Sequence, residues 1–179
     1  MCGIAGFLGK KIIDKNLIIS MHNVMNNRGP DNFSYFTKTT SQNMHVCLIH
    51  SRLAIIDLEA RSNQPFRIGN NIIIFNGEIY NYLELRNRLI EKGLKFETNS
   101  DTEVLLQYYN YYGSSCVNFF EGMWAFAIFN IEKNELLISR DRFGEKPIYI
   151  YKSAEGFYFA SEIKFIEKLS NSKFDINYK

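Results

Sequence analysis

Cysteine is scarce in this chain, with only Cys2, Cys47 and Cys116 among 179 residues. Because the number is odd and the spacings are wide, the pattern excludes a disulfide framework and matches no zinc-binding signature. Cys47 lies in an apolar run and Cys116 near the end of a helical segment, so we expect both to be small buried hydrophobic residues. Cys2 is different, because it directly follows the initiator methionine.

The sequence also lacks long apolar segments and any strong bias of charge. No run approaches the roughly 20 apolar residues that a membrane-spanning helix needs. Lys10 and Lys11 follow the first apolar run, whereas the basic residues of a signal peptide precede it. A net charge of +2 gives no reason to expect nucleic acid or a membrane surface as a partner. We therefore expect a protein of the reducing cytoplasm.

The apolar residues make up 46% of the chain and are arranged for an α+β domain. β-rich stretches occupy residues 2–8, 33–37, 44–49, 53–56, 72–75, 124–131, 135–140, 146–152 and 156–161. Helical spacing occupies residues 17–27, 80–92, 102–112 and 162–169. Because several strands are apolar on both faces, we predict two packed, mainly antiparallel sheets with helices on both outer faces, an αββα sandwich.

Two local signals inside these elements predict particular contacts. Gly3 and Gly6 lie within the first strand, where a glycine indicates close approach of another backbone or a ligand. Ser100 and Glu103 have the spacing of a capping box at the start of the third helix.

Cys2 carries a possible catalytic pair within one residue. Methionine is normally removed when the next side chain is small, and removal would leave a free α-amino group beside the thiol. An ordinary thiol titrates at about 8.5 and an α-amino group at about 7.7–8.0, so the thiol is mostly protonated at neutral pH and the amine can act as its base. From position alone, a cysteine that merely fills a gap in an apolar strand remains the alternative.

A second alternative for Cys2 is a Cys/His pair with His22, His45 or His50. No local signature supports this pair, and His45 and His50 flank an apolar strand, as structural or surface groups do. Two other positions have an ordinary interpretation: Asn76–Gly77 is typical of a turn, and Asp101 is an acidic residue favoured in the first turn of a helix.

Seven motifs occur in the order and spacing of one family: MCGIAGF, RGPD, HSRLAIID, FNGEIYNY, SDTEV, FEGMWAFAIFN and SRDRFGEKPIY. With these motifs the chain resembles the N-terminal glutaminase domain of glutamine-dependent asparagine synthetases. That domain belongs to the class II glutamine amidotransferases and has the N-terminal-nucleophile hydrolase fold. The resemblance covers nearly the whole chain, from Cys2 to about Lys168.

The resemblance implies hydrolysis of the side-chain amide of glutamine through a γ-glutamyl thioester. Cys2 matches the nucleophile, and Asn76 and Gly77 match the oxyanion hole. Arg52 matches the ligand of the substrate carboxylate, for which a guanidinium fork is suited, and Asp101 matches the residue that receives the substrate ammonium. The remaining substrate-binding positions implied by the match are Leu53, Ala54, Ile55, Ile56 and Glu78.

The resemblance also implies a partner domain. We assign residues 1–170 to the glutaminase domain and residues 171–179 to the start of a connection to a synthetase domain that the sequence lacks. ATP and magnesium are expected only for that domain, because no phosphate-binding glycine loop occurs here and no cofactor or metal is expected in this chain. We expect a truncated chain in preference to a stand-alone glutaminase, and a homodimer is a possible assembly.

The acceptor of the ammonia is less well defined than the glutaminase reaction. The proline of RGPD and the segment DRFGEKPIY favour the asparagine synthetase branch, which also includes amidotransferases of surface-sugar and secondary metabolism. A non-catalytic glutamine-binding domain of the same fold is a further alternative. We expect the chain alone to hydrolyse glutamine slowly, without forming asparagine.

Overall fold

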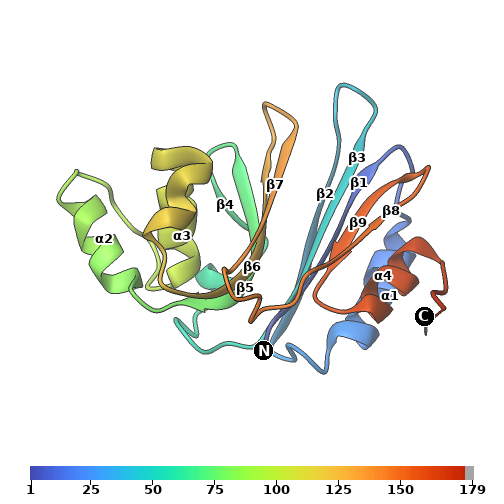
Figure 1. Ribbon diagram of the computed structural model, residues 1–179, viewed down its shortest axis with the longest axis horizontal. Coiled ribbons are helices and arrows are strands. Elements are labelled where there is room, and N and C mark those ends of the chain that lie inside the picture. The colour runs from blue at the N-terminus through green and yellow to red at the C-terminus, as the bar shows by residue number, and fades with distance from the viewer. Residues whose placement is uncertain (176–179) are drawn as a thin grey trace.

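The computed structural model describes residues 1–175, which form two antiparallel sheets between two pairs of helices (Figure 1). The five-stranded sheet has the order β2 (Asn32–Thr39), β3 (His45–Arg52), β1 (Gly3–Gly9), β9 (Gly156–Ala160) and β8 (Tyr149–Lys152). The four-stranded sheet has the order β4 (Phe66–Ile68), β5 (Asn71–Ile79), β6 (Gly122–Asn130) and β7 (Glu135–Arg140).

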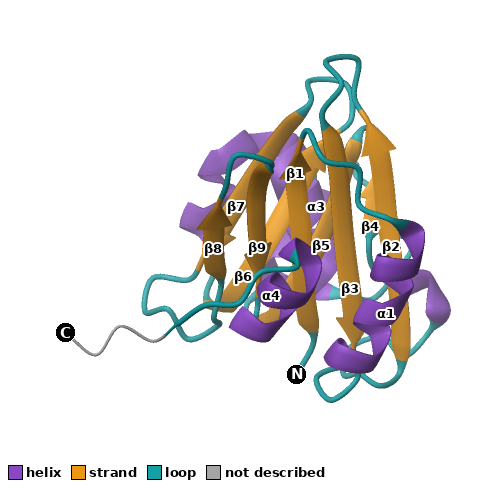
Figure 2. Ribbon diagram, turned by 90° about the vertical axis from the view of Figure 1, so that its right-hand side faces the viewer, coloured by secondary structure: helices purple, strands orange, loops and turns teal. Residues whose placement is uncertain are grey.

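The helices cover the outer face of each sheet. Figure 2 shows α1 (Lys15–Met25) and α4 (Ile163–Ser170) against the five-stranded sheet. On the opposite side, α2 (Tyr82–Ile90) and α3 (Asp101–Tyr112) cover the four-stranded sheet (Figure 1). Short 3₁₀ segments occupy Ala60–Ser62 and Gly113–Phe119. The predicted αββα sandwich is therefore confirmed, while the predicted connection at 171–179 extends beyond the described residues.

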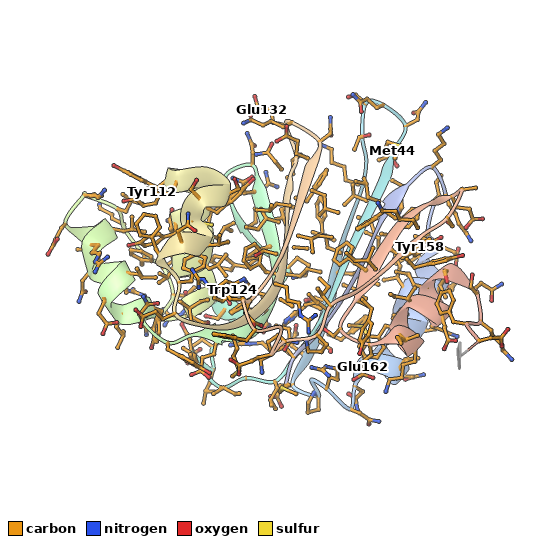
Figure 3. All side chains as sticks on the ribbon, in the orientation of Figure 1. Met44, Tyr112, Trp124, Glu132, Tyr158 and Glu162 are labelled. Carbon is orange, nitrogen blue, oxygen red and sulfur yellow. The ribbon has the colours of Figure 1, made fainter. Side chains whose placement is uncertain are left out.

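Successive side chains of β1 point to opposite faces of its sheet, so this one strand contributes to two apolar layers. Its Ile4 faces the other sheet, whereas Ala5 and Phe7 face α1 and α4. Full burial of a large apolar side chain such as Ile4 or Phe7 stabilises the fold by roughly 1.5–3 kcal/mol. Side chains fill all the layers in Figure 3, with Tyr112 on the α3 side and Tyr158 on the α4 side. The layer between the sheets consists of Ile4, Val46, Leu48, Ile72, Ile74, Ala125, Ala127, Phe129 and Phe159.

The two glycines of β1 do mark close approaches, but by side chains of neighbouring strands. A Cβ on Gly6 would lie 2.2 Å from the ring of Phe159, its partner on β9. A Cβ on Gly3 would lie 2.6 Å from Oγ of Ser51, its partner on β3. These contacts explain both glycines without a ligand.

Two local predictions are wrong, and in both cases distant partners decide the conformation. Residues 53–56 form a loop after β3, in which the Ala54 N–H donates to Asp31 Oδ2 at 2.7 Å. Asn76 and Gly77 lie within β5 and pair with Ala125 and Trp124 of β6, so they form no turn. Strand β4, with only three residues, was not predicted at all.

Candidate active site

A cavity of about 120 Å³ lies where β1 begins, β3 and β5 end, and α3 begins. It brings together the sequence-predicted site residues from four separate motifs, with Ala54 as the exception. The predicted residues that line it are Cys2, Arg52, Leu53, Ile55, Ile56, Asn76, Gly77, Glu78 and Asp101.

Cys2 is partly buried at the cavity wall, and both its sulfur and its backbone carbonyl accept hydrogen bonds. The Leu53 N–H donates to Sγ at 3.4 Å, and the Arg28 Nε donates to the Cys2 carbonyl at 2.8 Å. Arg28 also forms an ion pair with Glu162 at 3.0 Å, so this residue of the RGPD motif links the start of β1 to the segment before α4. Burial raises the pKa of the Cys2 thiol, and this outweighs the lowering by the Leu53 N–H, the nearby chain terminus and Arg52.

Arg52 is buried, and its guanidinium organises the loop that follows β3. Its Nη1 donates to the Glu59 carbonyl at 3.0 Å and to Asn63 Oδ1 at 2.8 Å. Its Nη2 donates to the carbonyls of Ile56 and Asp57. The arrangement differs from the free fork that the sequence suggested, because the two terminal nitrogens already bind loop oxygens. Arg52 therefore places positive charge at the cavity and fixes the loop that carries Ile55 and Ile56.

Asn76 lines the cavity and carries an unused hydrogen-bond donor. The residue is 1% exposed, and its Nδ2 has no partner within the described structure. Leaving a buried amide donor unpaired costs about 1–3 kcal/mol, so this atom is where a ligand oxygen would be most favourable. The adjacent Gly77 is glycine for a packing reason, since a Cβ would lie 2.2 Å from the Met123 carbonyl oxygen of β6.

Asp101 begins α3 and is held in the cavity by backbone groups. Its Oδ2 accepts the Ile79 N–H at 3.1 Å. Burial raises the pKa of this carboxyl to about 6, the Ile79 N–H partly opposes the rise, and nearby Glu78 adds to it. Ser100 caps the helix by accepting the Glu103 N–H at 3.2 Å.

The predicted capping box is only half formed. The Glu103 carboxylate accepts the N–H groups of Glu97 and Thr98, at 2.9 and 2.7 Å, and does not reach back to Ser100. Glu103 thus stabilises the chain that leads into the helix, and with it the position of Asp101.

Several cavity residues were missed by sequence reasoning, among them Gln64, Thr102, Met123 and Lys146. Lys146 is 6% exposed, and its ammonium contacts Met1 Sδ at 3.0 Å. It lies in the quoted segment DRFGEKPIY, which could have indicated it. Thr102 and Met123 likewise lie in the quoted segments SDTEV and FEGMWAFAIFN, whereas Gln64 lies outside all seven motifs and carries no comparable local signal.

Among the described residues no histidine lines the cavity, which removes the geometric basis for a Cys/His pair. His50 is buried, donates from Nε2 to the Phe75 carbonyl at 3.2 Å, and has its pKa lowered to about 3 by burial. His22 packs against the ring of Phe33. Cys47 and Cys116 are buried as predicted, and burial raises the pKa of each thiol to about 12.

Two negative findings concern the described residues, 1–175. No group of three or more histidine, cysteine, aspartate or glutamate side chains is placed to hold a metal ion there. None of the helices in this part combines the length and the apolar character that crossing a membrane requires.

A family model described as a glutamine amidotransferase domain matches residues 1–179. The chain therefore belongs to the glutamine amidotransferase domain family. It is 42% identical to the glutamine-hydrolyzing asparagine synthetase 1 of Bacillus subtilis over 92% of its own length, and 38% identical to asparagine synthetase 3 of that organism over 93%. The chain spans only 26% and 27% of these two relatives.

Solved structures show the same fold at low sequence identity. The glutamine phosphoribosylpyrophosphate amidotransferase from B. subtilis, complexed with ADP and GMP, aligns with a TM-score of 0.76 and 20% identity, over 94% of this chain and 44% of that one. A structure titled as the allosteric regulatory enzyme of purine biosynthesis aligns with a TM-score of 0.77, also at 20% identity, over 94% of this chain and 43% of that one. These neighbours confirm the predicted amidotransferase fold.

Proposed function

We propose that this domain hydrolyses the side-chain amide of glutamine to glutamate and ammonia, with Cys2 as the nucleophile. One observation carries the proposal: Cys2 and Asn76, whose buried Nδ2 has no partner among the described residues, line the same small cavity. A nucleophile beside a preorganised, buried donor is the arrangement that acyl transfer requires.

The thiol attacks the amide carbon, so that the Sγ–C bond forms while the carbonyl oxygen becomes an oxyanion. Asn76 Nδ2 and the Gly77 N–H stabilise that oxygen. The C–N bond then breaks, and the thiol proton, taken up by the base, leaves with ammonia. Water attacks the γ-glutamyl thioester, the C–S bond breaks, and glutamate and the free thiol result.

The protonation state of the Cys2 thiol indicates that its attack requires a general base. Because burial raises the pKa of Cys2, the sulfur is protonated at neutral pH and must lose its proton during attack. Removal of Met1 would free the α-amino group of Cys2 itself, next to its own sulfur. The absence of histidine from the described cavity wall supports this amine as the base.

The charges of the cavity suit a zwitterionic amino acid. Arg52 supplies positive charge for the α-carboxylate, and Asp101, assisted by Glu78, supplies negative charge for the α-ammonium. The apolar side chains of Leu53, Ile55 and Ile56 would contact the methylene groups between these two ends.

In the full-length protein the ammonia would feed a synthetase domain that uses ATP and magnesium to make asparagine. The names of the relatives and their greater length support this part of the proposal. Transfer to another acceptor, as in surface-sugar or secondary metabolism, is the alternative for the same glutaminase site. The present chain alone should release ammonia to solvent and form no asparagine.

A steady-state glutaminase assay on the wild-type chain and on Cys2→Ala tests the proposal. We expect the variant to lose roughly 10⁴-fold or more of the rate, in the range seen when a protease loses its nucleophile. Equal rates in the two proteins would exclude Cys2 catalysis. Glutamine binding without turnover in the wild type would indicate a non-catalytic glutamine-binding domain instead.

A further inference from the structure

Gln64 is a buried residue of the cavity wall, to which the proposed reaction assigns no role. It is 5% exposed, and its side-chain amide hydrogen-bonds at both ends. Its Oε1 accepts the Phe75 N–H at 2.6 Å, and its Nε2 donates to Thr102 Oγ1 at 3.1 Å. One side chain thus joins strand β5 to the first turn of α3.

The hydrogen bond between Gln64 and Phe75 of β5 replaces backbone pairing that the short strand β4 cannot supply. Strand β4 pairs with β5 only as far as Phe66 opposite Ile73. The backbone groups of Phe75 that would continue this ladder are taken by side chains instead: Gln64 accepts its N–H, and His50 donates to its carbonyl at 3.2 Å. Asn76 follows directly, so these two bonds fix the peptide that orients its unpartnered amide.

The α3 contact lies next to the other end of the cavity. Thr102 follows Asp101 in the first helical turn. A displacement of Thr102 would therefore move the carboxylate that the proposed function assigns to the substrate ammonium. The backbone carbonyl of Gln64 accepts a hydrogen bond from the hydroxyl of Ser34 on β2, in the five-stranded sheet. This bond fixes the position of the Gln64 backbone.

We propose that Gln64 is a positioning residue that sets the separation between the oxyanion-stabilising groups, Asn76 and Gly77, and the ammonium-binding Asp101. The inference rests on the proposed glutaminase reaction. Both ends of one small substrate must be held at once, and an error of about 1 Å in the placement of a reacting group can slow catalysis by about 10²-fold. The Gln64 amide connects both groups through a single rigid unit.

The test measures glutaminase kinetics on the whole chain, with active sites counted by covalent labelling of Cys2 with a chloroketone analogue of glutamine. Removal of either bridging group, by Gln64→Leu or Thr102→Val, should lower kcat per labelled site about 10–100-fold, with a smaller rise in KM from the displaced Asp101 carboxylate. Thr102→Ser is the matched control, because it keeps the hydroxyl acceptor and should retain a kcat close to wild type.

A combined Gln64→Leu and Thr102→Val variant should be no slower than the worse single variant, since both changes break the same bridge. Unchanged kcat per labelled site in the single variants, or a loss confined to KM, would overturn the inference. Thr102→Val decides alone where Gln64→Leu does not fold. If the wild type itself neither hydrolyses glutamine nor is labelled at Cys2, the proposed function fails, and the inference fails with it.

Discussion

The apolar layer between the sheets and the cavity at its end are built from the same strand faces. Ile4, Leu48 and Ile74 belong to the apolar layer between the sheets. Three cavity residues continue the same strands: Cys2, Arg52 and Asn76. Cys2 is two residues before Ile4, Arg52 is four after Leu48, and Asn76 is two after Ile74. Because strand side chains alternate with a period of two, each pair shares a face. The cavity is thus the polar end of the inter-sheet core.

The two regions differ in what burial does to the free energy. In the layer, burial removes apolar surface from water and stabilises the fold. In the cavity, burial leaves the Asn76 donor unpaired and raises the pKa of the Cys2 and Asp101 side chains. At neutral pH the unpaired donor and the raised pKa of Asp101 cost stability, and they are useful only when a ligand is present.

Ile74 and Asn76 lie on the same strand, β5, but Ile74 belongs to the apolar layer and Asn76 to the cavity. Ile74→Ala should lower the free energy of unfolding by about 2–5 kcal/mol, because Ile74 is 0% exposed. It should leave kcat per labelled Cys2 site within a few-fold of wild type. Denaturant unfolding and active-site titration measure the two quantities.

Asn76→Ala, two residues further along the same face, should show the reverse pattern. Loss of one oxyanion donor should lower kcat about 10²–10³-fold. The free energy of unfolding should change by less than about 1 kcal/mol, since the Nδ2 lost has no partner in the described structure. A glutaminase rate near wild type in this variant would show that Asn76 does not stabilise the oxyanion.

Asp101→Asn should stabilise the protein while weakening substrate binding. The folded-state pKa of about 6 lies above the ordinary value of 3.8, so protonation favours the folded state. That contribution is fully present below about pH 4 and lost as the pH rises through about 6. At about pH 8 the neutral variant should therefore gain up to about 3 kcal/mol, from about two pKa units.

Thermal unfolding at about pH 8 and about pH 4 provides the comparison for this variant, with the gain expected only at the higher pH. In the wild type, the KM for glutamine should rise as the pH falls below about 6, because protonation removes the charge that binds the ammonium. An equal gain in stability at both pH values would contradict the assigned burial of a charged Asp101.

The sequence predicts the layers well because each strand signals its burial through its own residues. The apolar runs at 124–131 and 135–140 correspond to β6 and β7, and the helical spacing at 102–112 corresponds to α3. The sequence predicts a strand at 53–56, but this segment forms a loop because Asp31 and Arg52, from outside the segment, impose its shape.

The site was predictable only in part, for a similar reason. Cys2 carries a local chemical signal, and the resemblance supplied Arg52, Asn76, Gly77 and Asp101. Gln64 could not be found, because its role depends on where β4 stops and on which helix then lies opposite. Such contacts arise only once both sheets are assembled.

In the proposed mechanism the thiol and its base share one residue, Cys2, at the start of the processed chain. Intact-mass and peptide mass spectrometry, before and after treatment with the chloroketone analogue of glutamine, tests it most directly. We predict a chain without Met1 that gains one adduct, located on Cys2, in step with loss of glutaminase activity. A fully active protein that retains Met1, or an adduct on Cys47 or Cys116, would contradict the account.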